Sequence, residues 1–301
     1  MSESAVPYRP LTPAGRFPGS PSQIVQRIPR RLSVYAGCVG LVILIGLVLL
    51  AMFPSAVAPY DPTKTVGRPL ARPSSQHLLG TNDIGQDLLS ELIWGTRASL
   101  TVGLVVGSLA VLMGAVVGLV AGYASGPTAG LLMRLTDLTL VLPFLPLVIL
   151  LSAYLGPSQR NVILVLVVVS WAGTARLVRS RVLTLLREPY IEAAQSVGCT
   201  QLRMITVHIW PGVRLIVFVQ WLLVASAAIL AEASLSFLGL GDPSSKSWGS
   251  MLYFARASGA FFGDAWRWWV LPAGLMITLT VLSLVLIGYT AEDALEPGLR
   301  G

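Results

Sequence analysis

Few residues in this chain have the type and spacing that catalysis or metal binding requires. The sequence contains two histidines, His77 and His208, and two cysteines, Cys38 and Cys199, at separations that match no metal-ligand motif. It has no GxxxxGK[ST] loop to hold nucleotide phosphates and no GxSxG elbow to present a nucleophilic serine. We therefore expect no catalytic residue, no metal site and no cofactor bound by the chain itself.

Glu232 is the acidic residue whose position most favours a functional role, because it lies near the end of a long apolar stretch. A carboxylate at membrane depth is costly and commonly contacts a substrate or relays protons. Alternatively, Glu232 hydrogen-bonds a neighbouring helix near the membrane surface, where the following SLSFLGLG segment permits a tight turn. A pathway role and a structural role therefore both stay open.

The segment 187–212, REPYIEAAQSVGCTQLRMITVHIWPG, is amphipathic and lies between two apolar stretches. Pro189 suits the first turn of a short helix, and Gly198 suits its end because glycine adopts a left-handed cap at little cost. Thr200 is placed to cap a second helix, which we expect Pro211 to end. Two short helices joined by a bend predict a docking element between two membrane spans.

The composition is that of a protein that crosses the membrane several times. The 301 residues are 54% hydrophobic and 12% charged, with a mean hydropathy of +0.74. A soluble domain cannot easily bury so much apolar surface, whereas a bilayer can cover it. The net charge of +7 is compatible with nucleic acid or anionic lipid as a partner, but the positions of the charges indicate membrane topology instead.

Six apolar stretches define the expected domain organisation. Each is close to the roughly 20 residues that a transmembrane helix needs. An N-terminal arm (1–33) precedes the first span (34–53), and a polar loop (54–96) contains a short interfacial helix at 87–94. The region 97–290 holds five spans and the 187–212 segment, and 291–301 form a tail. The five later spans are expected near 99–123, up to 154, 161–178, 213–238 and 268–289.

Two of these spans carry residues with specific structural consequences. The second contains glycines at four-residue spacing, at positions 103, 107, 114, 118 and 122. Such a stripe allows two membrane helices to approach closely, so we expect this helix to be buried among others. The third span contains Pro143 and Pro146, which should kink it.

The distribution of basic residues predicts the orientation. An even number of spans places both termini on one side, and 13 of the 21 lysines and arginines fall on that side. Basic residues are enriched in the cytoplasmic loops of membrane proteins. Both termini and the 187–212 segment are therefore expected in the cytoplasm.

The 187–212 segment resembles the EAA motif of ABC-importer permeases, and we refer to it below as the EAA loop. The matching residues are Glu192, Ala193, Ala194, Gly198 and Pro211. At the apolar and leucine positions of the motif the chain has His208 and Trp210, so the second half departs from the pattern.

Three further segments are similar to the same family. They are 77–103, with Gln86 in place of the usual arginine, 232–252, and 268–300, with Glu296 in place of the usual aspartate. On these segments the chain is identified as a member of the C-type permeases of dipeptide, oligopeptide and nickel ABC importers. The resemblance covers nearly everything from 34 to 300.

This resemblance implies an all-α polytopic membrane protein with the type I ABC importer permease fold, six transmembrane helices and a cytoplasmic coupling helix. In the family, the EAA loop sits in a groove of an ATPase, so Glu192, Ala193 and Ala194 are implied as contacts and Gly198 as the bend. The implied partners are a second, B-type permease, two ABC ATPase subunits that bind ATP and Mg²⁺, and an extracytoplasmic substrate-binding protein. No nucleic acid is implied.

The implied location is the bacterial or archaeal cytoplasmic (inner) membrane, and the implied cargo is a dipeptide or oligopeptide. A nickel or other metal-chelate importer of the same family is the alternative. An ATP-independent channel and a membrane enzyme are alternatives of a different class. The EAA loop argues against the channel, and the lack of a catalytic constellation argues against the enzyme.

Overall fold

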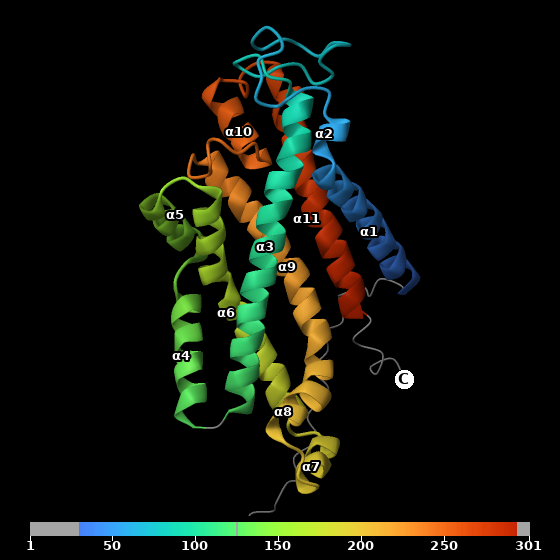
Figure 1. Ribbon diagram of the computed structural model, residues 1–301, viewed down its shortest axis with the longest axis vertical. Helices are drawn as coiled ribbons and strands as arrows, with labels where there is room; N and C mark the ends of the chain where they lie inside the picture. The colour runs from blue at the N-terminus through green and yellow to red at the C-terminus, as the bar shows by residue number, and fades with distance from the viewer. Residues whose placement is uncertain (1–29, 125, 294–301) are drawn as a thin grey trace, which may run out of the picture.

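The computed structural model describes residues 30–124 and 126–293, which form helices and their connections (Figure 1). The long helices are α1 (Arg30–Met52), α3 (Leu88–Tyr123), α6 (Gln159–Leu185), α9 (Trp210–Phe237) and α11 (Val270–Asp293). The shorter helices are α2 (Pro54–Val57), α4 (Pro127–Val141), α5 (Phe144–Leu155), α7 (Pro189–Ser196), α8 (Gln201–Arg203) and α10 (Trp248–Ala257). A π-helical segment, Met204–Ile209, joins α8 to α9, and a 3₁₀ turn, Ala265–Arg267, precedes α11. The expected all-α membrane architecture is confirmed.

The six predicted spans appear as five continuous helical stretches and one broken pair. Within residues 30–124 and 126–293, five stretches are long and apolar enough to cross a membrane, and α4 and α5 qualify only together, with a 90° bend between them. Pro143 lies at this bend as the residue before α5, where it cannot supply the N–H that would continue α4. Pro146 falls in the first turn of α5 and causes no second kink, because first-turn N–H groups have no partner within the helix.

The prediction of a separate interfacial helix at 87–94 is wrong, because these residues form the N-terminal cap and first turns of the long helix α3. Asp87 caps this helix by accepting a hydrogen bond from the Ser90 N–H at 2.9 Å. Leu88 and Leu92 are buried in a core that also contains Trp248 of α10. Their apolar face therefore packs against other helices and not against a membrane surface.

The glycines of α3 allow the close helix packing that the sequence predicts, and they do so with two different partners. A Cβ on Gly103 would lie 2.5 Å from Cγ1 of Ile229, on α9. A Cβ on Gly118 would lie 2.5 Å from the backbone oxygen of Ala175, on α6. Because real Cβ atoms do not approach so closely, only glycine permits α3 to pack in this way between α6 and α9.

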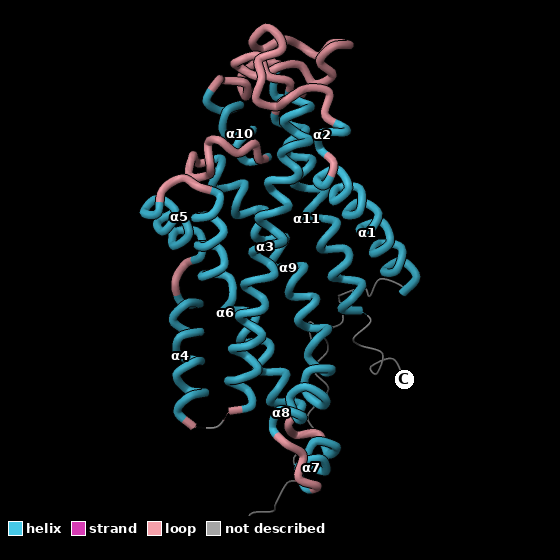
Figure 2. The backbone as a smooth tube through the Cα atoms, viewed as in Figure 1, coloured by secondary structure: helices cyan, strands magenta, loops and turns pink. Residues whose placement is uncertain are grey.

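Three buried apolar clusters hold the bundle together. The first joins α1, α3, α9, α10 and α11, the second joins α3, α5, α6 and α9, and the third attaches α7 to α3, α6 and α9. Figure 2 shows that the long loop before α3 gathers with α10 at one end of the molecule, whereas α7 forms the other end. The two ends carry different candidate sites.

Candidate functional site

The helix α7 stands at the tip of the bundle and is attached to it by one face (Figure 1). Pro189 occupies its first turn, as the sequence predicts, and Ile191 is fully buried in the cluster formed with α3, α6 and α9. Ala194 is half-buried against the same cluster, while Glu192 and Ala193 are exposed. The EAA residues thus divide into an anchoring face and an outward face.

Gly198 ends α7 in a left-handed backbone conformation, with φ of 79°. Its N–H donates to the carbonyl of Gln195 at 3.0 Å, and the Cys199 N–H donates to the carbonyl of Ala194 at 3.1 Å. These two bonds form a Schellman cap. Among the residues that the structure describes, none lies within 4 Å of a Cβ placed on Gly198, so the conformation and not the space selects glycine. The predicted bend is confirmed.

The second half of the EAA loop differs from the prediction in two respects. The Thr200 side chain makes no capping hydrogen bond. Pro211 does not end the helix, because the π-helical segment Met204–Ile209 continues into α9 and places Pro211 in the first turn of that helix. His208, one departure from the motif, lies with its ring 6.5 Å from that of Tyr190 of α7. The loop is therefore one short helix, a bend, and a continuous helix into the membrane span.

Glu232 lies on α9 at the opposite end of the bundle from α7 and is 5% exposed. Its Oε1 accepts a hydrogen bond from Ser236 at 2.7 Å, and its Oε2 accepts one from Ser99 of α3 at 3.2 Å. The hydroxyl of Ser99 also accepts a bond from the Trp248 N–H, at the start of α10, at 3.3 Å. A void of about 10 Å³ adjoins the carboxylate, which is room for about one water molecule. Glu232 thus links three helices beside a space far smaller than a peptide.

A polar network that the sequence analysis did not identify joins α3 to the segment before α10. Lys246 Nζ donates to Glu91 Oε1 at 2.5 Å and to Gln86 Oε1 at 2.7 Å. Asn82 Nδ2 donates to the same two oxygens at 3.0 Å each. We call these four residues the polar clasp. Its members lie in segments 77–103 and 232–252, but 155 positions separate Glu91 from Lys246, so only the fold reveals the pairing.

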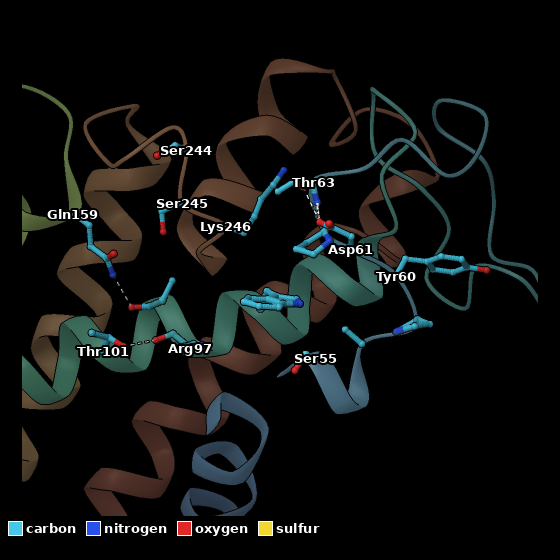
Figure 3. Close-up of a pocket in the computed structure, with 15 residues that line it drawn as sticks. Ser55, Tyr60, Asp61, Thr63, Arg97, Thr101, Gln159, Ser244, Ser245 and Lys246 are labelled. Atoms are coloured by element: carbon cyan, nitrogen blue, oxygen red, sulfur yellow. Dashed lines mark hydrogen bonds between the residues drawn. The ribbon is translucent and has the colours of Figure 1, made fainter. Parts of the chain in front are cut away.

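A cavity of about 710 Å³ opens beside the polar clasp (Figure 3). Its walls come from four parts of the chain that are distant in sequence: 55–63, 94–101, Gln159 and 244–246. Arg97, Lys246 and Asp61 bring charges of both signs to these walls. The hydroxyl and N–H of Thr63 donate to Asp61 Oδ1 at 2.6 and 3.0 Å and lower the pKa of this carboxyl. Asp61 is therefore negatively charged at neutral pH.

Residues 114–301, which include the end of α3, the EAA loop and the later helices, match the family described as "Binding-protein-dependent transport system inner membrane component". The chain belongs to this family. The match covers more than half of the permease and includes every EAA residue named above.

Individual relatives extend the similarity to most of the permease. It is 39% identical over 272 residues to the di/tripeptide transport system permease protein DppC of Pseudomonas aeruginosa, covering 87% of this chain and 88% of the relative. It is 39% identical over 275 residues to the dipeptide transport system permease protein DppC of Escherichia coli K12, covering 87% of this chain and 89% of the relative. It is 33% identical over 267 residues to the oligopeptide transport system permease protein OppC of Bacillus subtilis, covering 87% and 85%.

The residues that the sequence analysis named fall at two separate ends of the permease. The residues Glu192, Ala193, Ala194 and Gly198 lie together in α7 and its cap. Glu232 instead lies near the start of α10, to which Ser99 connects it by hydrogen bonds. These residues therefore cannot form one site. Within residues 30–124 and 126–293, no three His, Cys, Asp or Glu side chains lie close enough together to hold a metal ion.

Proposed function

We propose that this permease forms half of the translocation pathway of an ATP-driven importer of dipeptides or oligopeptides, and that α7 couples the pathway to separate ATPase subunits. The observation that carries the coupling role is the geometry of α7, which is anchored by Ile191 and exposes Glu192 and Ala193 at the tip of the bundle. The relatives named for dipeptide, di/tripeptide and oligopeptide transport support the cargo, and they favour a peptide over a metal chelate.

The surface around α7 has the character of a protein-binding site. Tyr190, Val197 and Leu202 are 48%, 84% and 74% exposed, and they lie at the bundle tip beside the charged Glu192. Exposed apolar side chains gathered on one surface mark interaction sites. A groove in an ATPase subunit would bury these three side chains and pair the carboxylate.

The connection from α7 to the membrane span is suited to transmitting movement. Helical structure is continuous from Gln201 to Phe237, and it crosses Pro211 without a break. A Cβ on Gly212 would lie 2.8 Å from Cδ1 of Leu185, so the start of α9 is packed closely on α6. An ATPase that binds α7 differently in two states would therefore bias the positions of α6 and α9.

The remaining subunits of the proposed importer are those that the family resemblance implies. Because its sequence has no P-loop, two ABC ATPase subunits would bind ATP and Mg²⁺. A second, B-type permease would complete the pathway, and an extracytoplasmic binding protein would deliver the cargo. We place both termini and α7 in the cytoplasm of a bacterium or archaeon and α10 on the outer side of its inner membrane, and we assign Glu232 a structural role.

The test of the coupling role is Gly198→Asp in the complete transporter, reconstituted in proteoliposomes. We expect the complex to assemble while uptake of dialanine and cargo-stimulated ATP hydrolysis fall to background, because the change alters the bend and adds a charge at the ATPase contact. The control is Gly126→Asp, at a glycine outside the EAA loop that also has a positive φ, 81°, and no other part of the chain within 4 Å of a Cβ. Normal coupled uptake by the Gly198 variant would refute the role of α7.

A further inference from the structure

Arg97 contributes a cation to the wall of the 710 Å³ cavity. In the part of the chain that the structure describes, its guanidinium makes no hydrogen bond, ion pair or aromatic contact, and the residue is exposed. Lys246, the other cation of the cavity, is already engaged by Glu91 and Gln86. The positive charge available to a ligand in this cavity is therefore that of Arg97.

A second, apolar recess adjoins the same residue. It has a volume of about 390 Å³ and lies between α1 and α3, lined by Val48, Ala51, Met52, Leu100 and Leu104. Arg97 and Thr101 line both spaces, so the guanidinium stands where the polar cavity meets the apolar recess. A ligand bound at Arg97 could place a charged group in one space and an apolar group in the other.

The polar wall favours a zwitterion over a simple anion. Asp61 contributes a negative charge to the same cavity; its pairing with the exposed Lys64 is long, at 3.6 Å, and leaves the carboxylate open to solvent. Gln159, Ser244 and Ser245 contribute amide and hydroxyl groups (Figure 3). The volume is within the range of about 300–1,000 Å³ that is typical of small-molecule sites. A short peptide has a carboxylate, an ammonium, amide groups and apolar side chains, and it matches each of these features.

We propose that this cavity is a peptide-binding site on the permease itself, in which Arg97 binds the terminal carboxylate of the cargo. The planar guanidinium can donate two parallel hydrogen bonds to a carboxylate. Asp61 attracts the terminal ammonium, and the recess between α1 and α3 accepts an apolar side chain. This assignment rests on the proposed function, because it gives the cargo a place at the end of the bundle opposite α7.

The test measures binding by the purified complex of permease and ATPase subunits without the binding protein, so that any preference belongs to the membrane part. The probes are radiolabelled dialanine and dialanine amide, which lacks the terminal carboxylate. We expect the wild-type complex to bind the free acid at least about tenfold more tightly, as a charge-assisted hydrogen bond provides. Arg97→Gln should remove this preference by weakening acid binding alone, and Arg97→Lys should keep part of it.

The matched control is Arg160→Gln, which removes an exposed arginine at the start of α6. Arg160 lines neither the cavity nor the apolar recess. Its acid preference should equal that of the wild type. An unchanged preference in Arg97→Gln, or an equal loss of acid and amide binding, would overturn the assignment. The assignment would also be overturned if phosphatidylglycerol vesicles bound to the complex in a way that depends on Arg97 while peptide binding did not depend on Arg97. Arg97 would then hold a lipid headgroup.

Uptake by the complete wild-type transporter distinguishes failure of the cavity assignment from failure of the proposed importer function. If the reconstituted complex imports dialanine but the permease shows no Arg97-dependent acid preference, the cavity assignment fails and the importer function stands. If the complex imports neither dialanine nor trialanine, the proposed function fails and the cavity assignment fails with it.

Discussion

Glu91 and Lys246 form a buried ion pair that holds the start of α3 against the segment before α10. Their side chains are 4% and 18% exposed, and Asn82 and Gln86 complete their hydrogen bonds. Burying two charges is costly, so such a pair adds little stability relative to apolar residues, but removing one partner leaves the other charge uncompensated. The pair therefore fixes how the two segments meet.

Breaking a fully buried ion pair costs about 3–5 kcal/mol. Lys246→Met should lower the free energy of unfolding of the permease by somewhat less than this, because Lys246 keeps some contact with water. The double variant Glu91→Gln with Lys246→Met should recover part of the loss, because no unpaired charge remains. Denaturant unfolding of the purified protein followed by tryptophan fluorescence measures both.

Lys64→Met is the control, since Lys64 is 74% exposed and pairs with Asp61 at 3.6 Å, where a change in the free energy of unfolding below about 1 kcal/mol is expected. Equal losses at Lys246 and Lys64 would contradict the role of the clasp.

Glu232→Gln should leave peptide uptake near the wild-type level, because glutamine can keep hydrogen bonds to Ser99 and Ser236. Glu232→Ala should destabilise the permease by about 1–3 kcal/mol, since the hydroxyls of these serines lose their acceptor. Uptake assays and unfolding curves on the same preparations distinguish the two effects. A large loss of uptake by the glutamine variant in an intact complex would show that Glu232 belongs to the pathway.

The helix α3 is the element on which the packing of the bundle depends. Its glycines at 103 and 107 face α9, and those at 114, 118 and 122 face α6. Without a hydrophobic driving force between helices in lipid, such close backbone contact supplies the attraction. At Gly114 and Gly118 the nearest atoms to a new Cβ are backbone oxygens of α6 at 2.5 Å, so a methyl group there must push the two helix backbones apart.

Gly118→Ala should reduce stability by about 1–3 kcal/mol, the usual effect of overpacking, because the new Cβ would lie 2.5 Å from the backbone oxygen of Ala175. The control is Gly173→Ala on α6, where a Cβ meets nothing within 4 Å. Since alanine favours helix formation, this variant should be as stable as the wild type or more so. The yield of folded protein after heating detects the difference, and equal behaviour of the two variants would rule out the stripe as the cause.

The molecule as a whole has two dissimilar ends, with α7 at one and the cavity, α10 and the long loop at the other (Figure 1). A continuous helix connects them, because α9 begins beside α7 and ends at Phe237, five residues beyond Glu232. In the proposed importer, this helix links the ATPase contact to the end that receives the cargo.

Cysteine labelling tests which end faces the cytoplasm. In a variant without Cys38 and Cys199, Val197→Cys and Phe262→Cys place single thiols at residues that are 84% and 97% exposed at opposite ends. In intact cells whose outer layers are permeable to the reagent, a membrane-impermeant maleimide should label the Phe262 variant only. Inverted membrane vesicles should give the opposite pattern, and reversal of both results would place α7 outside the cell.

The sequence by itself determined the membrane spans and several of the local helix endings. Apolar length predicted the spans, Pro189 and Gly198 predicted the bounds of α7, and Pro143 predicted the break before α5. These features depend on backbone conformation and hydropathy within a few residues, so local sequence is sufficient. The glycine stripe of α3 likewise predicted close packing.

Only the tertiary structure decided how these elements combine. Packing of Leu88 and Leu92 against α10 makes the expected interfacial helix part of α3. The π-helical segment Met204–Ile209, anchored in the core by Met204 and Ile209, continues into α9 past Pro211. The polar clasp joins residues that are 155 positions apart, and the cavity draws its walls from four separate segments. Such contacts arise from the relative placement of whole helices, which the residues of any one segment do not encode.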